Sequence, residues 1–246
     1  MITNFKKYFV LKNYLTYLTY LIPCLRGRCK ETYSQHGEDL LIRSALKMIG
    51  VEKPSYLDIG TNYPILGNNT FLFYSKGSCG VCIEPNPDLF KLIVGSRKRD
   101  ICLNIGVGVT NNSSLNFYVM SANALSTFVK SEADKYVKEN NYGTQRIEKI
   151  IKVPVTSIDS IMTRYFPGGV DVVSLDTEGY DFEILKSLNL KEYRPKVFCV
   201  ETLRYEKEKK LKKQDEIIAF MAERGYFLYA DTYINSIFVD KGIWPF

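Results

Sequence analysis

The sequence lacks the features that mark several large protein classes. It has one histidine and no uncharged apolar run of 18 residues, and the second absence argues against a polytopic membrane protein. A lone histidine offers too few ligands for a zinc site, although Cys79 and Cys82 form one C-x-x-C pair. The G-x-G-x-x-G pattern, which lets a backbone approach a pyrophosphate closely, is also missing. These absences disfavour zinc and dinucleotide proteins.

The six cysteines are scattered rather than spaced as a disulfide framework. Cys82, Cys102 and Cys199 lie in strand-like apolar runs, where cysteine behaves as a small core residue. We therefore expect a reducing, cytoplasmic location, with a redox pair at Cys79 and Cys82 as the alternative. The apolar content of 46% suits one enzyme-sized globular domain.

Acidic residues are absent from the first 30 positions, which carry six basic ones. Without those six, the 33 basic residues fall to 27 and match the 27 acids, so the net charge of +6 belongs to this arm. The remaining domain is neutral, which argues against a nucleic-acid partner.

The arm, residues 1–32, also carries many tyrosines and leucines between its basic residues. This composition suits a helix lying at the inner face of a membrane, or one that packs on the domain or on a second copy in a homodimer. Lys12 interrupts the apolar stretch and no A-x-A-like site follows, which argues against a cleaved signal peptide. We assign residues 33–246 to a single domain.

Strand-like and helix-like segments alternate through this domain, which predicts an α/β fold with a mainly parallel sheet. The polar segment 121–150 interrupts the alternation, and we interpret it as an insertion that covers a substrate. Helices are expected near 38–49, 68–76, 87–94, 131–140, 157–166, 180–190 and 213–224. Strands are expected near 55–59, 80–84, 101–105, 115–120, 151–155, 171–176 and 196–201.

The C-terminal part adds two strand-like runs, 226–230 and 236–240, separated by a short polar loop. A helical crossover does not fit between them, so they must run antiparallel. A parallel sheet of seven strands that ends in an antiparallel hairpin strand resembles the Rossmann-like sheet of class I methyltransferases.

Two of the expected strands end at a carboxylate, Asp58 in one and Glu84 in the next. Open α/β sheets bind ligands at the carboxyl ends of their strands. An acid at the end of the second strand suits the hydroxyls of a ribose. The pair therefore predicts a cofactor that contains a nucleoside.

Several short motifs occur in one order along the chain. They are Tyr33-Ser34-Gln35-His36-Gly37-Glu38-Asp39, Asp58-Ile59-Gly60-Thr61-Asn62, Asn69-Thr70, Cys82-Ile83-Glu84-Pro85-Asn86-Pro87, Val173-Ser174-Leu175-Asp176-Thr177-Glu178-Gly179 and Tyr193-Arg194-Pro195-Lys196-Val197-Phe198-Cys199-Val200-Glu201. Together they resemble the FkbM-type methyltransferase family, over residues 33 to about 203. The arm, the insertion and the C-terminal strands carry no recognisable motif.

The resemblance implies methyl transfer from S-adenosylmethionine (SAM), usually to a hydroxyl oxygen of a sugar in a polysaccharide, glycolipid or natural-product precursor. It places Asp58 and Gly60 beside the methionine part of the cofactor, Glu84 on the ribose, and Asn104, Ile105 and Gly106 at the adenine. The loop after Gly60 departs from the Gly-rich loop of many class I enzymes. The candidate cofactor residues are Gln35, Glu38, Asp58, Gly60, Asn62, Glu84, Asn104, Ile105, Gly106 and Asp176.

A sugar hydroxyl is a weak acid, so a base close to the acceptor would help its methylation. Asp176 and Glu178 lie two residues apart at a strand end, and Glu201 ends the neighbouring strand. The three acids could instead hold Mg²⁺, which prefers oxygen ligands, but we do not predict a metal. His36 is a further candidate base.

Other interpretations remain open for these residues. Gln35, Glu38 and Asp39 could simply cap the helix that follows, Asp176 could orient backbone, and Glu178 could pair with a lysine. The domain could also be a non-catalytic cofactor-binding module, or a nucleotide-sugar or nicotinamide enzyme on a similar sheet.

Overall fold

The computed structural model describes residues 30–111, 113–139, 143–205 and 211–246. The chain divides into two compact units, residues 1–32 and 33–246, and the helices and strands of the described residues belong to the second. The predicted membrane or dimer contact of the arm lies outside the described residues. No helix in the described part of the chain is long and apolar enough to cross a membrane.

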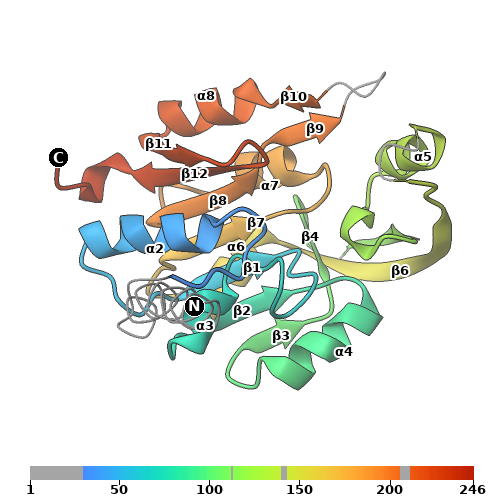
Figure 1. The fold of residues 1–246 in the computed structure, drawn as a ribbon, viewed down its shortest axis with the longest axis horizontal. Helices are drawn as coiled ribbons and strands as arrows, with labels where there is room; N and C mark the ends of the chain where they lie inside the picture. Colours follow the sequence, from blue (N-terminus) through green and yellow to red (C-terminus); the bar gives the residue numbers. More distant parts are fainter. Residues whose placement is uncertain (1–29, 112, 140–142, 206–210) are drawn as a thin grey trace, which may run out of the picture. The chain divides into compact units, whose positions relative to one another are not determined.

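The second unit is built on a seven-stranded sheet with the order β11-β12-β8-β7-β1-β2-β3 (Figure 1). Only β12 runs against its neighbours β8 and β11. The predicted parallel sheet with a C-terminal antiparallel hairpin is therefore confirmed. The strands are β1 (Tyr56–Ile59), β2 (Gly80–Ile83), β3 (Ile101–Leu103), β7 (Val172–Leu175), β8 (Val197–Glu201), β11 (Tyr226–Asp231) and β12 (Asn235–Asp240).

Helices cover both faces of this sheet, because side chains along its strands alternate between two apolar cores. Leu57 and Val173 pack with α6, α7 and α8 on one face, whereas Tyr56 and Val172 pack with α2, α3 and α4 on the other. Strands buried on both faces read as continuous apolar runs in sequence. The helices are α2 (Glu38–Met48), α3 (Phe71–Ser75), α4 (Pro87–Ser96), α6 (Ile158–Tyr165), α7 (Asp181–Ser187) and α8 (Asp215–Glu223).

Two of the expected strands, 115–120 and 151–155, lie outside the main sheet. The strand expected at 151–155 is the longer β6 (Ile147–Ser157), which pairs with β5 (Ser113–Met120) and β4 (Gly106–Gly108) in a separate three-stranded sheet. Its placement in the main sheet was therefore wrong. Helices cover both faces of the main sheet, and its strands β1, β7 and β12 are buried throughout. Many residues of β6 are exposed, so this strand does not suit a position between two layers of helices.

The 121–150 insertion contains a 3₁₀ turn, η1 (Asn123–Leu125), the helix α5 (Lys130–Glu139) and the first residues of β6. The helix expected at 131–140 is thus confirmed. A short hairpin of β9 (Leu203–Tyr205) and β10 (Leu211–Lys213) follows β8, and the turn η3 (Lys241–Ile243) follows β12.

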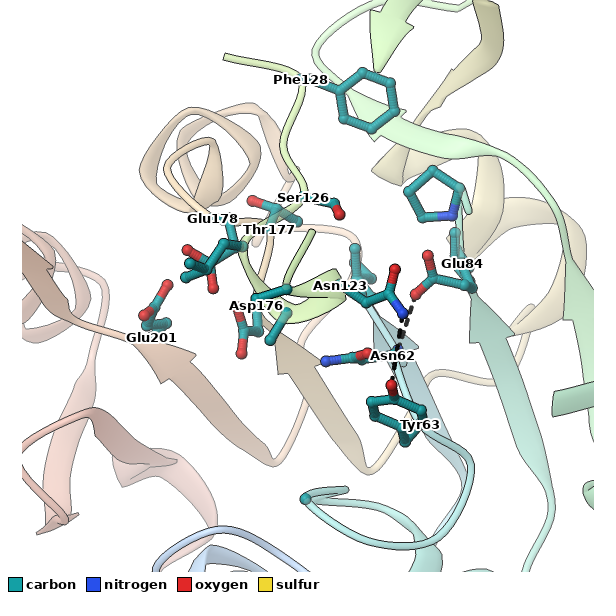
Figure 2. A pocket seen from close by; sticks show the side chains of 18 of the residues that line it. Asn62, Tyr63, Glu84, Asn123, Ser126, Phe128, Asp176, Thr177, Glu178 and Glu201 are labelled. Carbon is teal, nitrogen blue, oxygen red and sulfur yellow. Dashed lines mark hydrogen bonds between the residues drawn. The ribbon is translucent and has the colours of Figure 1, made fainter. Parts of the chain in front are cut away.

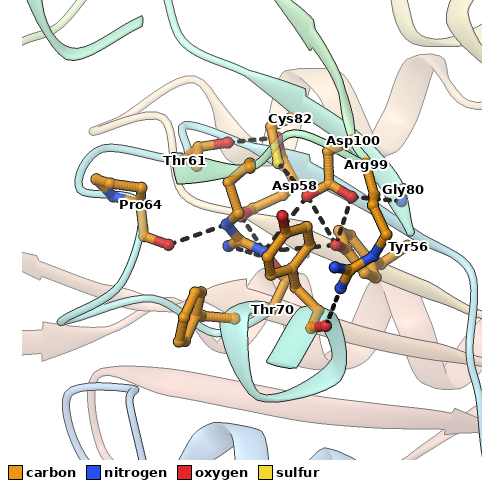
Figure 3. Close-up of polar contacts among 12 residues, drawn as sticks. Tyr56, Asp58, Thr61, Pro64, Thr70, Gly80, Cys82, Arg99 and Asp100 are labelled. Atoms are coloured by element: carbon orange, nitrogen blue, oxygen red, sulfur yellow. Dashed lines mark hydrogen bonds and ion pairs between the residues drawn. The ribbon is translucent and has the colours of Figure 1, made fainter. Parts of the chain in front are cut away.

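A buried network of charged and polar groups fixes the loops that follow β1. Arg97 is fully buried and lies 3.4 Å from a carboxylate oxygen of Asp100, which is itself buried. Its Nη2 donates to Asn68 and Thr70, at 2.6 Å and 3.0 Å. Asp58 accepts bonds from the same two side chains. Figure 3 shows Asp58, Thr70 and Asp100 gathered around these contacts.

The other partners tie this network into the main sheet. Asp100 accepts from the Tyr56 hydroxyl at 2.7 Å and from the Gly80 amide at 2.9 Å. Arg97 Nε donates to the Pro64 carbonyl at 2.9 Å. The network therefore joins the starts of β1 and β2 to residues 64–70, which lead to the ligand edge of the sheet.

We predict that Arg97→Met strongly destabilises the protein. The change leaves Asp100 as an unpaired buried carboxylate, which costs about 3–5 kcal/mol of unfolding free energy. Urea unfolding followed by circular dichroism measures the loss. The control is Arg99→Met, because Arg99 is exposed and stacks on Tyr74, and it should cost less than about 1 kcal/mol. Equal losses in the two variants would contradict the prediction.

Candidate active site

A cavity of about 710 Å³ opens at the carboxyl ends of β1, β2, β7 and β8. Volumes of this order are typical of small-molecule sites. Figure 2 shows Glu84 at one end and Asp176, Glu178 and Glu201 at the other, with Asn62 between them. The cavity therefore lies where the strand-end motifs predicted a ligand.

Ten of the predicted site residues line this cavity. They are Gln35, His36, Gly60, Asn62, Glu84, Ile105, Gly106, Asp176, Glu178 and Glu201. Three others do not line it: Glu38, Asp58 and Asn104.

The three side chains outside the lining have partners in the protein. Asp58 is 3% exposed and bonds to Asn68 and Thr70. Glu38 accepts from Thr232 and from Asn235. Asn104 donates to the main-chain carbonyl of Glu84 at 2.7 Å. Asp58, Glu38 and Asn104 thus support the walls around the cavity.

Glu84 is arranged to receive hydroxyl donors. One carboxylate oxygen accepts from the main-chain N–H of Asn62 and the other from the main-chain N–H of Asn86, each at 2.8 Å. Each oxygen keeps a further lone pair for a ligand. The side chain is 4% exposed, and burial raises the pKa of Glu84 to about 7. This carboxylate suits the vicinal hydroxyls of a ribose.

Gly60 allows two strand ends to meet at the cavity. Its φ is +79°, and a Cβ atom built there would lie 1.8 Å from the carbonyl oxygen of Asp176. A larger residue would therefore push the end of β1 away from the end of β7. The glycine that the motif predicted beside the cofactor is required by this close approach.

The opposite end of the cavity holds three carboxylates. One oxygen from each of Asp176, Glu178 and Glu201 lies within 4.8 Å of the other two. Burial raises the pKa of Asp176 to about 7, and the charges of Asp181 and Asp58 add to this rise. Burial, followed by the charges of its neighbours, raises the pKa of Glu178 and of Glu201 well above the usual range. Carboxyl groups with such raised pKa values gain and lose protons closer to neutral pH than ordinary ones do, which makes this group a candidate for proton transfer.

The loop that carries Glu178 is held by Asp181, the first residue of α7. Its carboxylate accepts from the Thr177 amide at 2.8 Å, from the Thr177 hydroxyl at 3.0 Å and from the Gly179 amide at 3.2 Å. Asp181 is thus a loop-forming residue, and Glu178 adopts a left-handed backbone with φ 54°.

The charge of the cavity is one-sided. Among the described residues that line it there is no lysine or arginine, whereas four are carboxylates. The site suits ligands that are neutral or positively charged where they meet these acids. Acidic groups of this kind are common without a metal, and three carboxylates by themselves do not define a coordination shell, so we assign no metal.

The insertion supplies lining residues that no motif indicated. Asn123, Ser126 and Phe128 face the cavity, and Asn123 contacts the Tyr63 hydroxyl at 3.5 Å. Residues 121–150 are polar and irregular in sequence, so only their position as an insertion pointed to a covering role.

The raised pKa values predict how stability depends on pH without ligand. Glu84 and Asp176 hold protons up to about pH 7 when folded, against ordinary values of 4.5 and 3.8. Their contribution to stability is therefore complete below about pH 4 and is lost as pH rises through 7. The melting temperature should fall by at least about 3 °C from pH 6 to pH 8. Scanning calorimetry would measure it.

The control is the double variant E84Q/D176N, in which the fall should be smaller. A melting temperature of the unmodified protein that rises between pH 6 and pH 8 would contradict the assigned protonation.

Three solved structures are similar to this chain at low sequence identity. The crystal structure of a methyltransferase FkbM from Methylobacillus flagellatus KT has 12% identity and a TM-score of 0.45, covering 76% of this chain and 43% of that one. The chain thus spans less than half of that protein. A putative RNA methyltransferase from Pyrococcus horikoshii has 11% identity and a TM-score of 0.41, with 85% and 88% covered.

A third solved structure, the magnesium protoporphyrin IX methyltransferase of Synechocystis PCC 6803 with bound SAM, has 10% identity and a TM-score of 0.38, with 82% and 77% covered. No curated protein matches the chain. The family described as the methyltransferase FkbM domain matches residues 58–228, which is more than half of the chain. The chain therefore belongs to the FkbM methyltransferase family, whose methyl donor is SAM.

Proposed function

We propose that the protein transfers the methyl group of SAM to a hydroxyl oxygen of a carbohydrate or glycolipid acceptor. The observation that carries the proposal is one cavity with a ribose-type carboxylate, Glu84, at one end and three proton-accepting carboxylates at the other. Glu84 would hold the ribose of the cofactor. Asp176, Glu178 and Glu201 would face its sulfonium and the acceptor.

The bound cofactor supplies a methyl carbon that is already activated by the positive sulfur. The carbon–oxygen bond forms as the carbon–sulfur bond breaks, and the hydroxyl proton passes to one of the three carboxylates. Alignment of the two reactants supplies roughly 7–11 kcal/mol in favourable cases, and a positioned base supplies about 10²–10⁴ in rate. The protein's part is to align the reactants, exclude water and accept that proton.

The charge of the cavity supports a neutral acceptor. A phosphorylated group beside the three acids would be repelled, and the described lining has no lysine or arginine to offset this. A neutral sugar hydroxyl meets no such penalty. The aromatic ring of Phe128 and the exposed Tyr63 offer apolar faces on which a sugar ring can stack.

The first prediction from this proposal concerns cofactor binding. Glu84→Gln removes the charge that strengthens the ribose bonds, so the affinities for SAM and for S-adenosylhomocysteine should both fall at least about tenfold. Isothermal titration calorimetry measures both. In the unmodified protein, affinity for S-adenosylhomocysteine should weaken as pH falls below about 7, because Glu84 is then protonated. The control Glu183→Gln changes an exposed carboxylate on α7.

NAD serves as the competing ligand in the same titration. Binding of NAD in place of SAM would overturn the assignment and favour a nicotinamide enzyme. If the unmodified protein bound none of SAM, NAD and S-adenosylhomocysteine, the result would contradict the proposed activity and favour a domain that keeps only the fold.

The second prediction concerns the transfer itself. Methyl-labelled SAM is incubated with a panel of neutral oligosaccharides and glycolipids, and with phosphorylated sugars as the comparison set. Label should enter an oxygen of a neutral acceptor. D176N, E178Q and E201Q remove candidate bases, so at least one should slow transfer by roughly 100-fold or more. Each should leave the affinity for S-adenosylhomocysteine within about threefold.

Mass spectrometry of the hydrolysed product locates the methyl group. A methyl group found on nitrogen, or only on phosphorylated sugars, would contradict the proposal. Full transfer by all three variants would remove the carboxylates from the role of base.

A further inference from the structure

The insertion contacts the loop of Glu178 at two points. The Tyr136 hydroxyl, on α5, donates to a carboxylate oxygen of Glu178 at 2.6 Å. The Thr127 hydroxyl donates to the main-chain carbonyl of the same residue at 2.9 Å. Both donors come from a segment that precedes Glu178 by more than 40 residues in sequence. The insertion therefore holds both the side chain and the backbone of one acid in the cavity.

Glu178 needs such support because its backbone is unfavourable. A non-glycine residue at φ 54° costs free energy and persists where its surroundings hold it. Support also comes from the other side, since Arg204 on β9 donates to the carbonyl of Gly179 at 3.0 Å. The loop thus sits between the insertion and the β8–β9 segment, and only the insertion bonds to the Glu178 carboxylate among the described residues.

We propose that Tyr136 and Thr127 are positioning residues for Glu178, which hold its carboxylate at the end of the cavity that receives the sulfonium of SAM. The inference rests on the proposed function. It assigns the insertion a second task besides covering the acceptor. Without these two donors, the carboxylate turns away from the cavity, although the cavity itself remains.

The inference has a specific consequence for ligand charge. SAM carries a positive sulfur, whereas S-adenosylhomocysteine has a neutral thioether at the same place. A carboxylate held near this atom attracts the first ligand more than the second, most strongly where water is excluded. Glu84, by contrast, would contact the ribose that both ligands share. Displacement of Glu178 should therefore change the ratio of the two affinities, not only their size.

Other charged or titratable groups face Glu178 and set the background for this effect. They are Asp176 just after β7, Glu201 on β8, Arg204 on β9, Glu132 and Tyr136 on α5, and Asp181 at the start of α7. Lys135 pairs with Glu132 at 3.4 Å. These groups stay in place in each tested variant, except for the residue that is changed.

The test measures the dissociation constants of SAM and S-adenosylhomocysteine by calorimetry at pH 8. Tyr136→Phe should weaken SAM binding about threefold or more and leave S-adenosylhomocysteine within about twofold. Thr127→Val should act in the same direction, and Thr127→Ser should restore the unmodified ratio because it keeps the hydroxyl. The control Tyr229→Phe removes a hydroxyl that bonds to Ser44, between β11 and α2, and should change neither constant.

A double variant tests whether Tyr136 acts through Glu178. E178Q should lower the ratio by itself, and Y136F added to E178Q should lower it no further. Additive effects in the double variant would overturn the inference. So would equal weakening of both ligands by Y136F, which is what a merely structural role predicts.

The result also separates this inference from the proposed function. An unmodified protein that binds neither ligand contradicts both. Binding of both ligands with a ratio that Y136F and T127V leave unchanged contradicts the positioning role alone.

Discussion

The parallel pairing of β1 with β7 is the interaction on which the rest of the site depends. It aligns Ile59 with Leu175, and the Asp176 amide then donates to the Ile59 carbonyl at 3.1 Å. The same register places Gly60 directly against the Asp176 carbonyl. The loop that follows β1 and the acid loop that follows β7 therefore begin at one point. A shift of one residue in this register would turn the side chains of the shifted strand to the opposite face of the sheet.

The protein spends stability to keep its acids out of bulk water. Asp58 lies beside the Arg97 network, where burial outweighs the arginine and raises the pKa of the carboxyl group. Burial also raises the pKa of the acids that line the cavity, which have no lysine or arginine beside them among the described lining residues. Asp58 thus has partners within the protein, whereas the acids of the cavity face a space that a ligand can enter.

Sequence patterns predicted the elements with strong periodicity and the residues at strand ends. The run around Leu57, the helix that follows Glu38 and the C-terminal hairpin all appear where they were expected. The pattern failed for β6, because a strand between two helices reads the same whether it joins the main sheet or a separate one.

The sequence also did not reveal that the side chain of Asp58 lies outside the lining of the cavity. Its partners Asn68 and Thr70 lie in a loop, and Arg97 lies 39 residues after Asp58, so no local pattern shows that these side chains meet Asp58. The bond from Tyr136 to Glu178 could not be predicted for the same reason, because the two residues are 42 positions apart and meet only in the folded chain.

Gly106 gives the cavity a fixed dimension. A Cβ atom at this position would lie 2.4 Å from the ring of Phe128, so the ring rests directly on backbone. Phe128 also packs on Phe117, with ring centroids 4.7 Å apart, and it has little room to retreat. The distance between this ring and the ends of the strands is therefore fixed by packing, and it limits how thick a ligand in this part of the cavity can be. Alanine in place of Gly106 would displace the ring of Phe128 and change the space beside it. A flat group bound next to this ring would be affected more than a bulky group bound at the opening of the cavity.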